Sequence, residues 1–167
     1  MKTKSLYLFF IVVMLSITTS CSSDANENPT PGASLPIVLN YSYSPDEMET
    51  MAIINKYRES KGLNSLERVN HVSHKSEEHD HYMIANNVVN HDDFVARSEN
   101  IIKVLGALRV SENIAYNYKT SQAAFDAWMN SPSHRENIEG DFTHFGLSIR
   151  ENPVNGRKYY TNIFVKM

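Results

Sequence analysis

Apolar residues recur every three or four positions through the middle of the chain, which is the spacing of helices with one buried face. The first such stretch begins at Ser44 and Pro45. With Glu47 three residues after Ser44, it has a capping box and a proline in the first turn. We therefore expect a helix that begins there and ends at Gly62, where glycine can adopt the left-handed backbone of a helix terminus.

The same spacing predicts a second helix over residues 70–87 and a third over residues 93–105. A short apolar helix is predicted around Trp128, the only tryptophan of the chain. This helix should end at Ser131, because Pro132 disfavours helical backbone at the residue before it.

The pattern changes in the last part of the chain. Apolar residues alternate with smaller or polar ones through residues 145–149 and again through 159–165, which is typical of strands. The turn-forming residues 152–156 lie between the two stretches. We expect a C-terminal β-hairpin. Helices followed by strands favour an α+β fold, in which helices are layered over one sheet.

The first residues have the pattern of an export signal. Lys2 and Lys4 precede an apolar run over residues 6–15, which is too short for an ordinary transmembrane helix. Small residues then lead to Cys21, the only cysteine, as in the lipidation motif of bacterial lipoproteins. The alternative is a plain signal peptide followed by an incidental cysteine.

These patterns predict three segments: a signal peptide (1–20), a lipidated cysteine with a flexible tether (21–40) and one folded domain (41–167). The tether is rich in serine, asparagine, proline and acidic residues, and its acidic residues resemble the surface-export signals of some bacterial lipoproteins. We therefore predict an exported protein that is lipid-anchored in a bacterial cell envelope, at the outer membrane or the cell surface.

Charge and cysteine content exclude two classes of protein. The chain of 167 residues has 16 basic and 19 acidic residues, a formal net charge of −3, and it has no basic stripe of the kind that binds nucleic acid. Removal of residues 1–20 takes away two lysines and no acidic residue, which makes the balance more negative. A single cysteine that is lipidated leaves none for disulfides. Stability must then come from a packed core, for which the domain is long enough.

Polar residues near the Trp128 helix are candidates for chemistry. Glu112 precedes this helix and His134 follows it, so their side chains can meet in one cleft, and His91 adds a third polar group. Glu112 as general base and His134 as general acid would be a pairing that hydrolases use. Ser131 could then be a nucleophile, although a serine before proline is more often a helix stop. Taken singly, each of these residues is more commonly an ordinary surface or helix-end residue.

The order of the motifs resembles a known family. Over residues 47–166 the chain is similar to the bacterial branch of the CAP superfamily, which includes cysteine-rich secretory, allergen and plant pathogenesis-related proteins. The resemblance implies a three-layer α-β-α sandwich with a central cleft that contains two histidines and acidic residues. It places the cleft residues at His91, Glu112 and His134. The matching segments are Ile54–Leu66, Asn90–Phe94, Ser111–Ala115, Ala127–Ile138, Phe145–Ile149 and Tyr159–Phe164.

Three departures from the family pattern concern the cleft and the disulfides. Ser111 replaces the usual glycine before the Glu-Asn-Ile motif, and the disulfides of the animal proteins are absent. Ser131 stands where the animal and plant proteins carry a second cleft glutamate. Two imidazoles and one carboxylate remain, so His91 and His134 could hold zinc or another divalent cation, with water in the open position. The predicted ligand cleft comprises His91, Glu112, Ser131 and His134.

The resemblance favours binding over catalysis, because no general enzymatic activity is established for CAP domains. The ligands that it implies are lipids or sterols, peptides and protein partners, besides the membrane reached through the lipid anchor. One alternative is a metal-assisted or acid–base hydrolase that acts on envelope peptides or glycans. Another is a structural envelope module, in which the cleft residues only tie the sheet to the helices.

The second helix carries a further group of histidines. The spacing of His74, Glu78 and His81 can bind a metal, but a run this polar is typical of a solvated helix face, which we expect here. We also expect His144 at the surface. The four histidines of the helix are His71, His74, His79 and His81.

Overall fold

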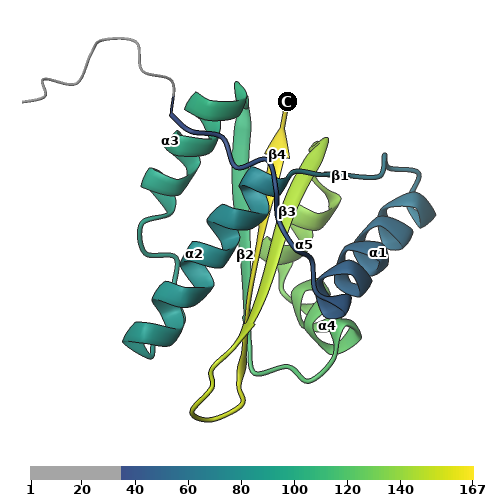
Figure 1. Ribbon diagram of the computed structural model, residues 1–167. Helices are drawn as coiled ribbons and strands as arrows, with labels where there is room; N and C mark the ends of the chain where they lie inside the picture. Colours follow the sequence, from purple (N-terminus) through teal and green to yellow (C-terminus); the bar gives the residue numbers. More distant parts are fainter. Residues whose placement is uncertain (1–34) are drawn as a thin grey trace, which may run out of the picture. The chain divides into compact units, whose positions relative to one another are not determined.

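The computed structural model describes residues 35–167 as a four-stranded sheet between two layers of helices (Figure 1). It confirms the expected α+β class and the three-layer sandwich. The signal peptide, Cys21 and most of the tether lie outside the described residues. The elements are α1 (Pro45–Ser60), β1 (Glu67–Arg68), α2 (Asn70–Asn86), α3 (Phe94–Leu105), β2 (Arg109–Tyr116), α4 (Ser121–Asn130), α5 (Pro132–Glu139), β3 (His144–Glu151) and β4 (Lys158–Lys166).

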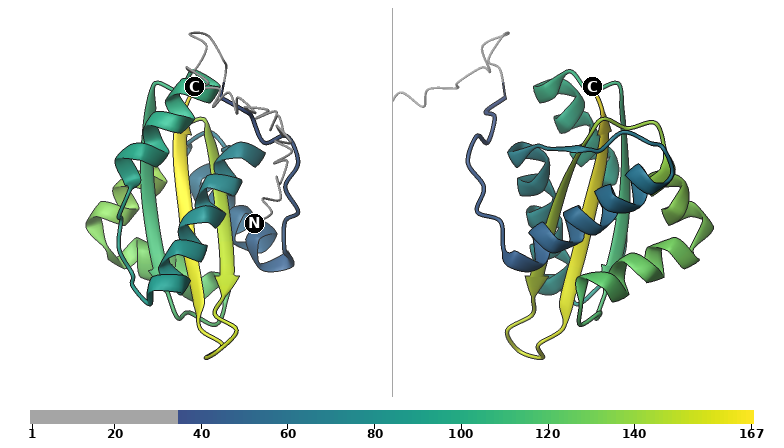
Figure 2. Two further views of the ribbon diagram at one scale, coloured as in Figure 1. Left: turned by 60° about the vertical axis from the view of Figure 1, so that its left-hand side comes forward. Right: turned by 90° about the vertical axis from the view of Figure 1, so that its right-hand side faces the viewer.

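The sheet has the strand order β1-β3-β4-β2, so β1 and β2 are its two edges. β1 runs parallel to β3, and the other neighbouring pairs are antiparallel. Helices α2 and α3 cover one face of the sheet, and α1, α4 and α5 cover the other (Figure 2). Because both faces are covered, residues 159–165 of β4 are buried without interruption.

The expected start of α1 is confirmed. The backbone N–H of Glu47 donates to the Ser44 hydroxyl at 3.2 Å, and the backbone N–H of Ser44 donates to Glu47 Oε2 at 2.7 Å. Helix α1 ends shortly before Gly62, which has a φ of 73°. The hairpin of β3 and β4 also forms where alternation predicted it.

Three elements were not predicted. Pro132 does end α4, but it also begins α5, because proline is well suited to the first position of a new helix. Ser131 is therefore the C-cap residue of α4 and also the N-cap residue of α5. The two-residue strand β1 lies between α1 and α2, and strand β2 lies between α3 and α4. The predicted order, with all helices before the strands, was therefore wrong in detail.

The main core lies between the sheet and the α1, α4 and α5 layer. Trp128 is 1% exposed and packs edge-to-face on Tyr160 of β4, with 6.4 Å between the ring centroids. Phe145 and Phe164 are fully buried in the same cluster. The opposite face carries two smaller apolar clusters under α2 and α3. The apolar helix around Trp128, α4, is thus part of the core. Its packing fixes the positions of the segments that precede and follow it.

Helix α2 packs unusually close to β3 at Gly146. A methyl group added at this glycine would lie 2.3 Å from the backbone nitrogen of Ser73 and 2.4 Å from the backbone carbon of Val72. No side chain fits there without moving the helix. The absence of a side chain at Gly146 therefore sets the distance between α2 and the sheet.

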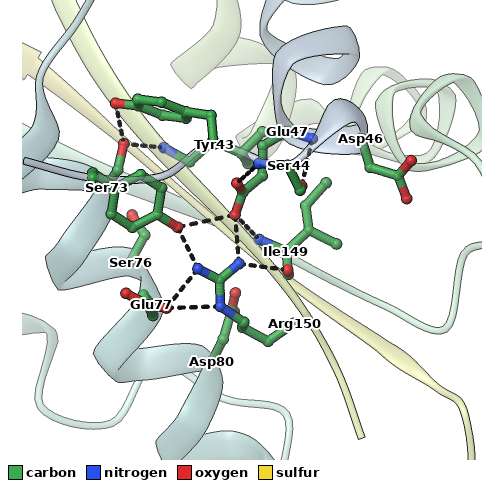
Figure 3. Close-up of polar contacts among 12 residues, drawn as sticks. Tyr43, Ser44, Asp46, Glu47, Ser73, Ser76, Glu77, Asp80, Ile149 and Arg150 are labelled. Atoms are coloured by element: carbon green, nitrogen blue, oxygen red, sulfur yellow. Dashed lines mark hydrogen bonds and ion pairs between the residues drawn. The ribbon is translucent and has the colours of Figure 1, made fainter.

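A buried ionic cluster joins α1, α2 and β3 (Figure 3). Glu47 is fully buried, and its Oε1 accepts from the backbone N–H of Ile149 at 2.9 Å and from Arg150 Nη1 at 2.7 Å. Arg150 also donates to Glu77 Oε1 from Nε at 2.9 Å and to the Tyr41 hydroxyl at 2.8 Å. The carboxylate that caps α1 thus also ties the helix to the sheet.

Among residues 35–167, no helix is long and apolar enough to cross a bilayer.

Candidate functional site

The predicted cleft residues lie at the β2 edge of the sheet. Glu112 is on β2 itself, and His134 is on α5. Two side chains from the helical layer bond to outward-facing carbonyls of this edge strand: Trp128 Nε1 donates to Ile114 O at 3.0 Å, and Asn137 Nδ2 donates to Glu112 O at 3.4 Å. These contacts hold α4 and α5 against the free edge, where β2 has no further strand to pair with.

Glu112 is held by two partners. Its side chain is 1% exposed. Arg97 Nε donates to Oε2 at 3.0 Å, and Arg97 Nη2 donates to Oε1 at 2.9 Å. His91 Nδ1 lies 2.8 Å from the same Oε1. Both carboxylate oxygens are thus engaged, and the negative charge is compensated by a guanidinium.

Arg97 is the residue of this site that the sequence analysis missed. It lies on α3, its side chain is 9% exposed, and Nη1 also donates to the backbone oxygen of Asp92 at 2.6 Å. A signal was present in the helical pattern, because Arg97 lies three residues after Phe94 and four before the buried Ile101. An arginine on the inward stripe of a helix requires a buried partner.

The loop that carries His91 is held by a buried histidine of α2. His79 is 1% exposed, and its Nε2 donates to the backbone oxygen of Asn90 at 2.8 Å. Its ring also stacks on Tyr82. Burial lowers the pKa of His79, and the hydrogen bond to Asn90 opposes that shift only in part. The neutral imidazole of His79 thus fixes the backbone directly before His91.

The face of α2 that carries His74, Glu78 and His81 is solvated, as expected, but the other two histidines of the helix are buried. The side chains of His74 and His81 are 36% and 63% exposed and lie near Glu77 and Glu78.

His71 and His79 are buried: His71 contacts Asn100 of α3 and the backbone of Val38, and His79 contacts the backbone of Asn90. One polar run of α2 therefore supplies both exposed and buried histidines, because side chains point in different directions around a helix.

His144 is half-buried rather than fully on the surface, because its ring contacts the Thr143 hydroxyl at 2.8 Å.

His134 is positioned through its backbone. Asn113 Nδ2 donates to the carbonyl oxygen of His134 at 2.9 Å, and the Asn113 side chain is itself held by Asn137 Nδ2 at 2.8 Å. Burial, and then the nearby imidazole of His91, lower the pKa of His134. The ring is therefore neutral at pH 7, with one nitrogen that donates and one that accepts.

Two hollows flank these histidines. One, of about 310 Å³, has His134 and Ser131 at its polar side and is otherwise lined by Val89, Ile114, Ala115, Tyr116, Tyr118, Ala127 and Trp128. We call it the His134 hollow. The other, of about 440 Å³, lies beside His91 and the first turns of α3. His91 lines the second hollow only, with a side chain that is 51% exposed.

The residues of the cleft do not fit a zinc site with three protein ligands. Within the part of the chain that the structure describes, no three His, Cys, Asp or Glu side chains are arranged to hold a metal ion. His91 and His134 supply two imidazoles, but the oxygens of Glu112 are engaged by Arg97, and a ligand must offer a free lone pair. We therefore derive no step through a metal.

Within the described residues, the groups proposed for acid–base catalysis also do not make the contacts that such catalysis needs. Glu112 would have to leave Arg97 to take a proton, and no hydrogen bond links it to His134 among the described residues. Within residues 35–167, the one hydrogen-bond partner of the Ser131 hydroxyl is the Ser133 hydroxyl, at 3.3 Å. A serine nucleophile needs a base within hydrogen-bond distance. The site brings His91 and Glu112 into direct contact and leaves His134 and Ser131 beside an apolar hollow.

Comparison with known proteins shows a family match and several structures with a similar fold. The profile of the cysteine-rich secretory protein family (CAP) matches residues 51–165. An outer surface protein from Borrelia burgdorferi has a similar fold, with a TM-score of 0.66 and 19% identity over 77% of this chain and 98% of that one. An extracellular protein containing an SCP domain from Bacillus anthracis aligns with a TM-score of 0.64 and 22% identity, over 77% of this chain and 45% of its own.

A curated relative is similar over a shorter stretch. The uncharacterized membrane protein YlbC of Bacillus subtilis is 42% identical over 59 residues, which are 35% of this chain and only 15% of that protein.

Proposed function

We propose that this chain, which belongs to the cysteine-rich secretory protein family, is an exported and lipid-anchored protein that binds the apolar part of a ligand in the His134 hollow. The ligand is a small apolar molecule such as a lipid, a peptide, or a side chain of a protein partner. The observation that carries the proposal is an apolar hollow with a neutral imidazole at its rim.

The composition of the hollow supports binding. Ligand sites combine apolar and aromatic walls with a few polar groups that set orientation. Here the walls come from the β2 edge and from α4, and Trp128 is held rigidly by its bond to Ile114. The lowered pKa of His134 keeps its ring uncharged, so it can approach an apolar ligand without the cost of burying a charge.

Binding is favoured over hydrolysis by the state of Glu112. A general base needs a free carboxylate near the proton it removes. Arg97 holds both oxygens of Glu112 in a buried pair, and His134 has no acidic partner among the described residues. The Arg97–Glu112 pair instead fixes α3 to β2 and so supports the rim of the cleft.

Export and anchoring are proposed from the first 21 residues. A basic start, a short apolar run and Cys21 match the processing signal of a lipoprotein. The Borrelia protein with the similar fold is an outer surface protein, and the Bacillus anthracis one is extracellular, which supports an exported role for this chain.

The hollow is tested by filling it. Ala127→Leu places three more carbons in the His134 hollow, and Ala85→Leu adds the same group at an exposed position of α2 as a control. Octanamide, N-acetyl-leucinamide and N-acetylglucosamine serve as lipid-like, peptide-like and glycan-like probes. We expect at least one apolar amide to bind to the full chain in calorimetric titrations.

That binding should weaken about tenfold or more in Ala127→Leu and in His134→Ala, and it should stay unchanged in Ala85→Leu. Absence of binding by all three probes, or binding that survives both cleft substitutions, would show that the hollow is not a ligand site. Hydrolysis of an amide bond of N-acetyl-leucinamide would favour the hydrolase instead, whereas N-acetylglucosamine has no glycosidic bond and tests binding alone.

A further inference from the structure

We propose that this protein has a second ligand site, at the opposite edge of the sheet, that takes a compact apolar molecule carrying one carboxylate. The site is a hollow of about 550 Å³ beside β1, larger than either hollow at the β2 edge. We call it the β1 hollow. Its volume falls within the range of about 300–1,000 Å³ that is typical of small-molecule sites.

The β1 hollow is separate from the cleft. In the strand order β1-β3-β4-β2, β1 and β2 are the two edges of the sheet (Figure 1). Residues of β1 line the β1 hollow, whereas residues of β2 line the His134 hollow. The β1 hollow exists because β1 is short: Glu67 and Arg68 pair with β3 only at His144 and Phe145. Within residues 35–167, no strand extends β1 beyond these two residues, and Met48 of α1 remains 41% exposed.

The floor of the β1 hollow is apolar and rigid. Met51, Leu66 and Phe145 line it and are at most 3% exposed, as members of the main core. Asn55 also lines it, but its amide is used twice by the backbone of Leu66, at 2.9 and 2.8 Å. The floor therefore offers apolar contact with few free hydrogen-bonding groups, which suits a hydrocarbon or aromatic body.

The rim carries a guanidinium without an anionic partner. Arg68 lies over the ring of Tyr43, 5.1 Å from its centroid, and Nη1 contacts the sulfur of Met48 at 2.6 Å. No carboxylate of residues 35–167 lies within ion-pair distance of it. Arg97 and Arg150, by contrast, each hold a carboxylate. A ligand carboxylate can therefore form the charge-assisted pair that Arg68 lacks.

The charge around Arg68 favours a single negative charge on the ligand. Glu67 also lines the hollow, although its carboxylate is 83% exposed and lies 3.6 Å from His144 Nε2. Glu67 repels a doubly charged group more strongly than a single carboxylate, and one carboxylate matches the planar fork of one guanidinium. Two sources have this chemistry, the C-terminus of a peptide with an apolar last residue and a free apolar acid.

The test uses matched acids and amides on the full chain. N-acetyl-phenylalanine represents a peptide C-terminus, 3-phenylpropanoate represents a free acid, and the corresponding primary amides lack only the charge. We expect at least one acid to bind in calorimetric titrations at low ionic strength and to bind about tenfold more tightly than its amide. Binding of both acids indicates a site for any apolar carboxylate, and binding of one identifies the source.

Three variants locate the bound acid. Arg68→Gln, at an exposed position, should weaken binding about tenfold, and Arg135→Gln, an exposed arginine on α5, should leave it unchanged. Ala127→Leu fills the His134 hollow and should also leave it unchanged. The proposal is overturned if neither acid binds, if acid and amide bind equally, or if Arg68→Gln has no effect. Loss of binding in Ala127→Leu would assign the acid to the cleft.

Discussion

The guanidinium of Arg97 and the carboxylate of Glu112 form a buried two-pronged ion pair, with Nε 3.0 Å from Oε2 and Nη2 2.9 Å from Oε1. The pair joins α3 to the edge strand β2 and also explains why Glu112 is a poor candidate for a base or a metal ligand. The carboxylate that the sequence offered as a general base is, in the fold, held between the guanidinium of Arg97 and the ring of His91.

Removal of Arg97 should be costly, because it leaves the buried carboxylate of Glu112 without its cation. Arg97→Met is expected to lower the free energy of unfolding by about 3–5 kcal/mol in urea denaturation. The double variant with Glu112→Gln should recover a large part of that loss, since the unpaired charge is then gone. A loss below about 1 kcal/mol for Arg97→Met alone would mean that the pair is not desolvated.

Gly146→Ala should destabilise the fold by about 3 kcal/mol or more, because the new methyl group meets the backbone of α2 and not a flexible side chain. Thermal and urea unfolding measure the effect. Glu151→Ala, at an exposed position of the same strand, is the control, and removal of this side chain should cost little. Equal losses for the two variants would contradict the close approach of α2 at Gly146.

Acid should loosen the segment before α1 through His71. Its Nδ1 accepts the backbone N–H of Val38 at 3.2 Å, and its Nε2 donates to Asn100 Oδ1 at 2.8 Å, which requires the neutral ring. Burial, mainly, lowers the pKa of His71; Lys75 and His74 lower it further, whereas Asn100 and Glu78 oppose the shift. The unfolded chain then binds the proton more readily than the folded one, so stability should fall as pH drops below about 6.5.

The slope of the unfolding free energy between about pH 7.5 and 5.5 measures this effect. His71→Gln should make the slope shallower, by no more than about 1.4 kcal/mol per pH unit. His81→Gln, at a 63% exposed side chain, should leave it unchanged. An identical slope in His71→Gln and in the parent protein would show that His71 is not protonated on unfolding.

Cys21→Ser should release the protein from the membrane fraction, because it removes the only thiol that can be acylated. Detergent partitioning of whole-cell extracts measures the change, with Ser22→Ala as the control. If the Cys21→Ser protein still partitions with detergent, the anchor is not a lipid on this cysteine.

The local elements could be read from the sequence because their signals lie within a few residues of each other. The capping box of Ser44 and Glu47 marks the start of α1, and the alternation on both sides of residues 152–156 marks the hairpin. Each depends on backbone hydrogen bonds and side-chain periodicity that are satisfied inside the element itself. Pro132 shows the limit of such signals, since the same proline that ends α4 also begins α5.

Only the tertiary structure decided which polar residues are buried together. Arg97 and Glu112 are 15 positions apart, and on α2 His71 and His79 are buried whereas the side chains of His74 and His81 are 36% and 63% exposed. Neighbours in the sequence cannot report these differences, because they depend on which helix covers which strand. The sequence determined most of the helices, the C-terminal hairpin and the family resemblance. Packing of α3 on β2 decided that Arg97 compensates the charge of Glu112, and the tertiary structure alone decided that Arg68, on the short strand β1, has no carboxylate partner among the described residues, because both depend on groups far apart in the sequence.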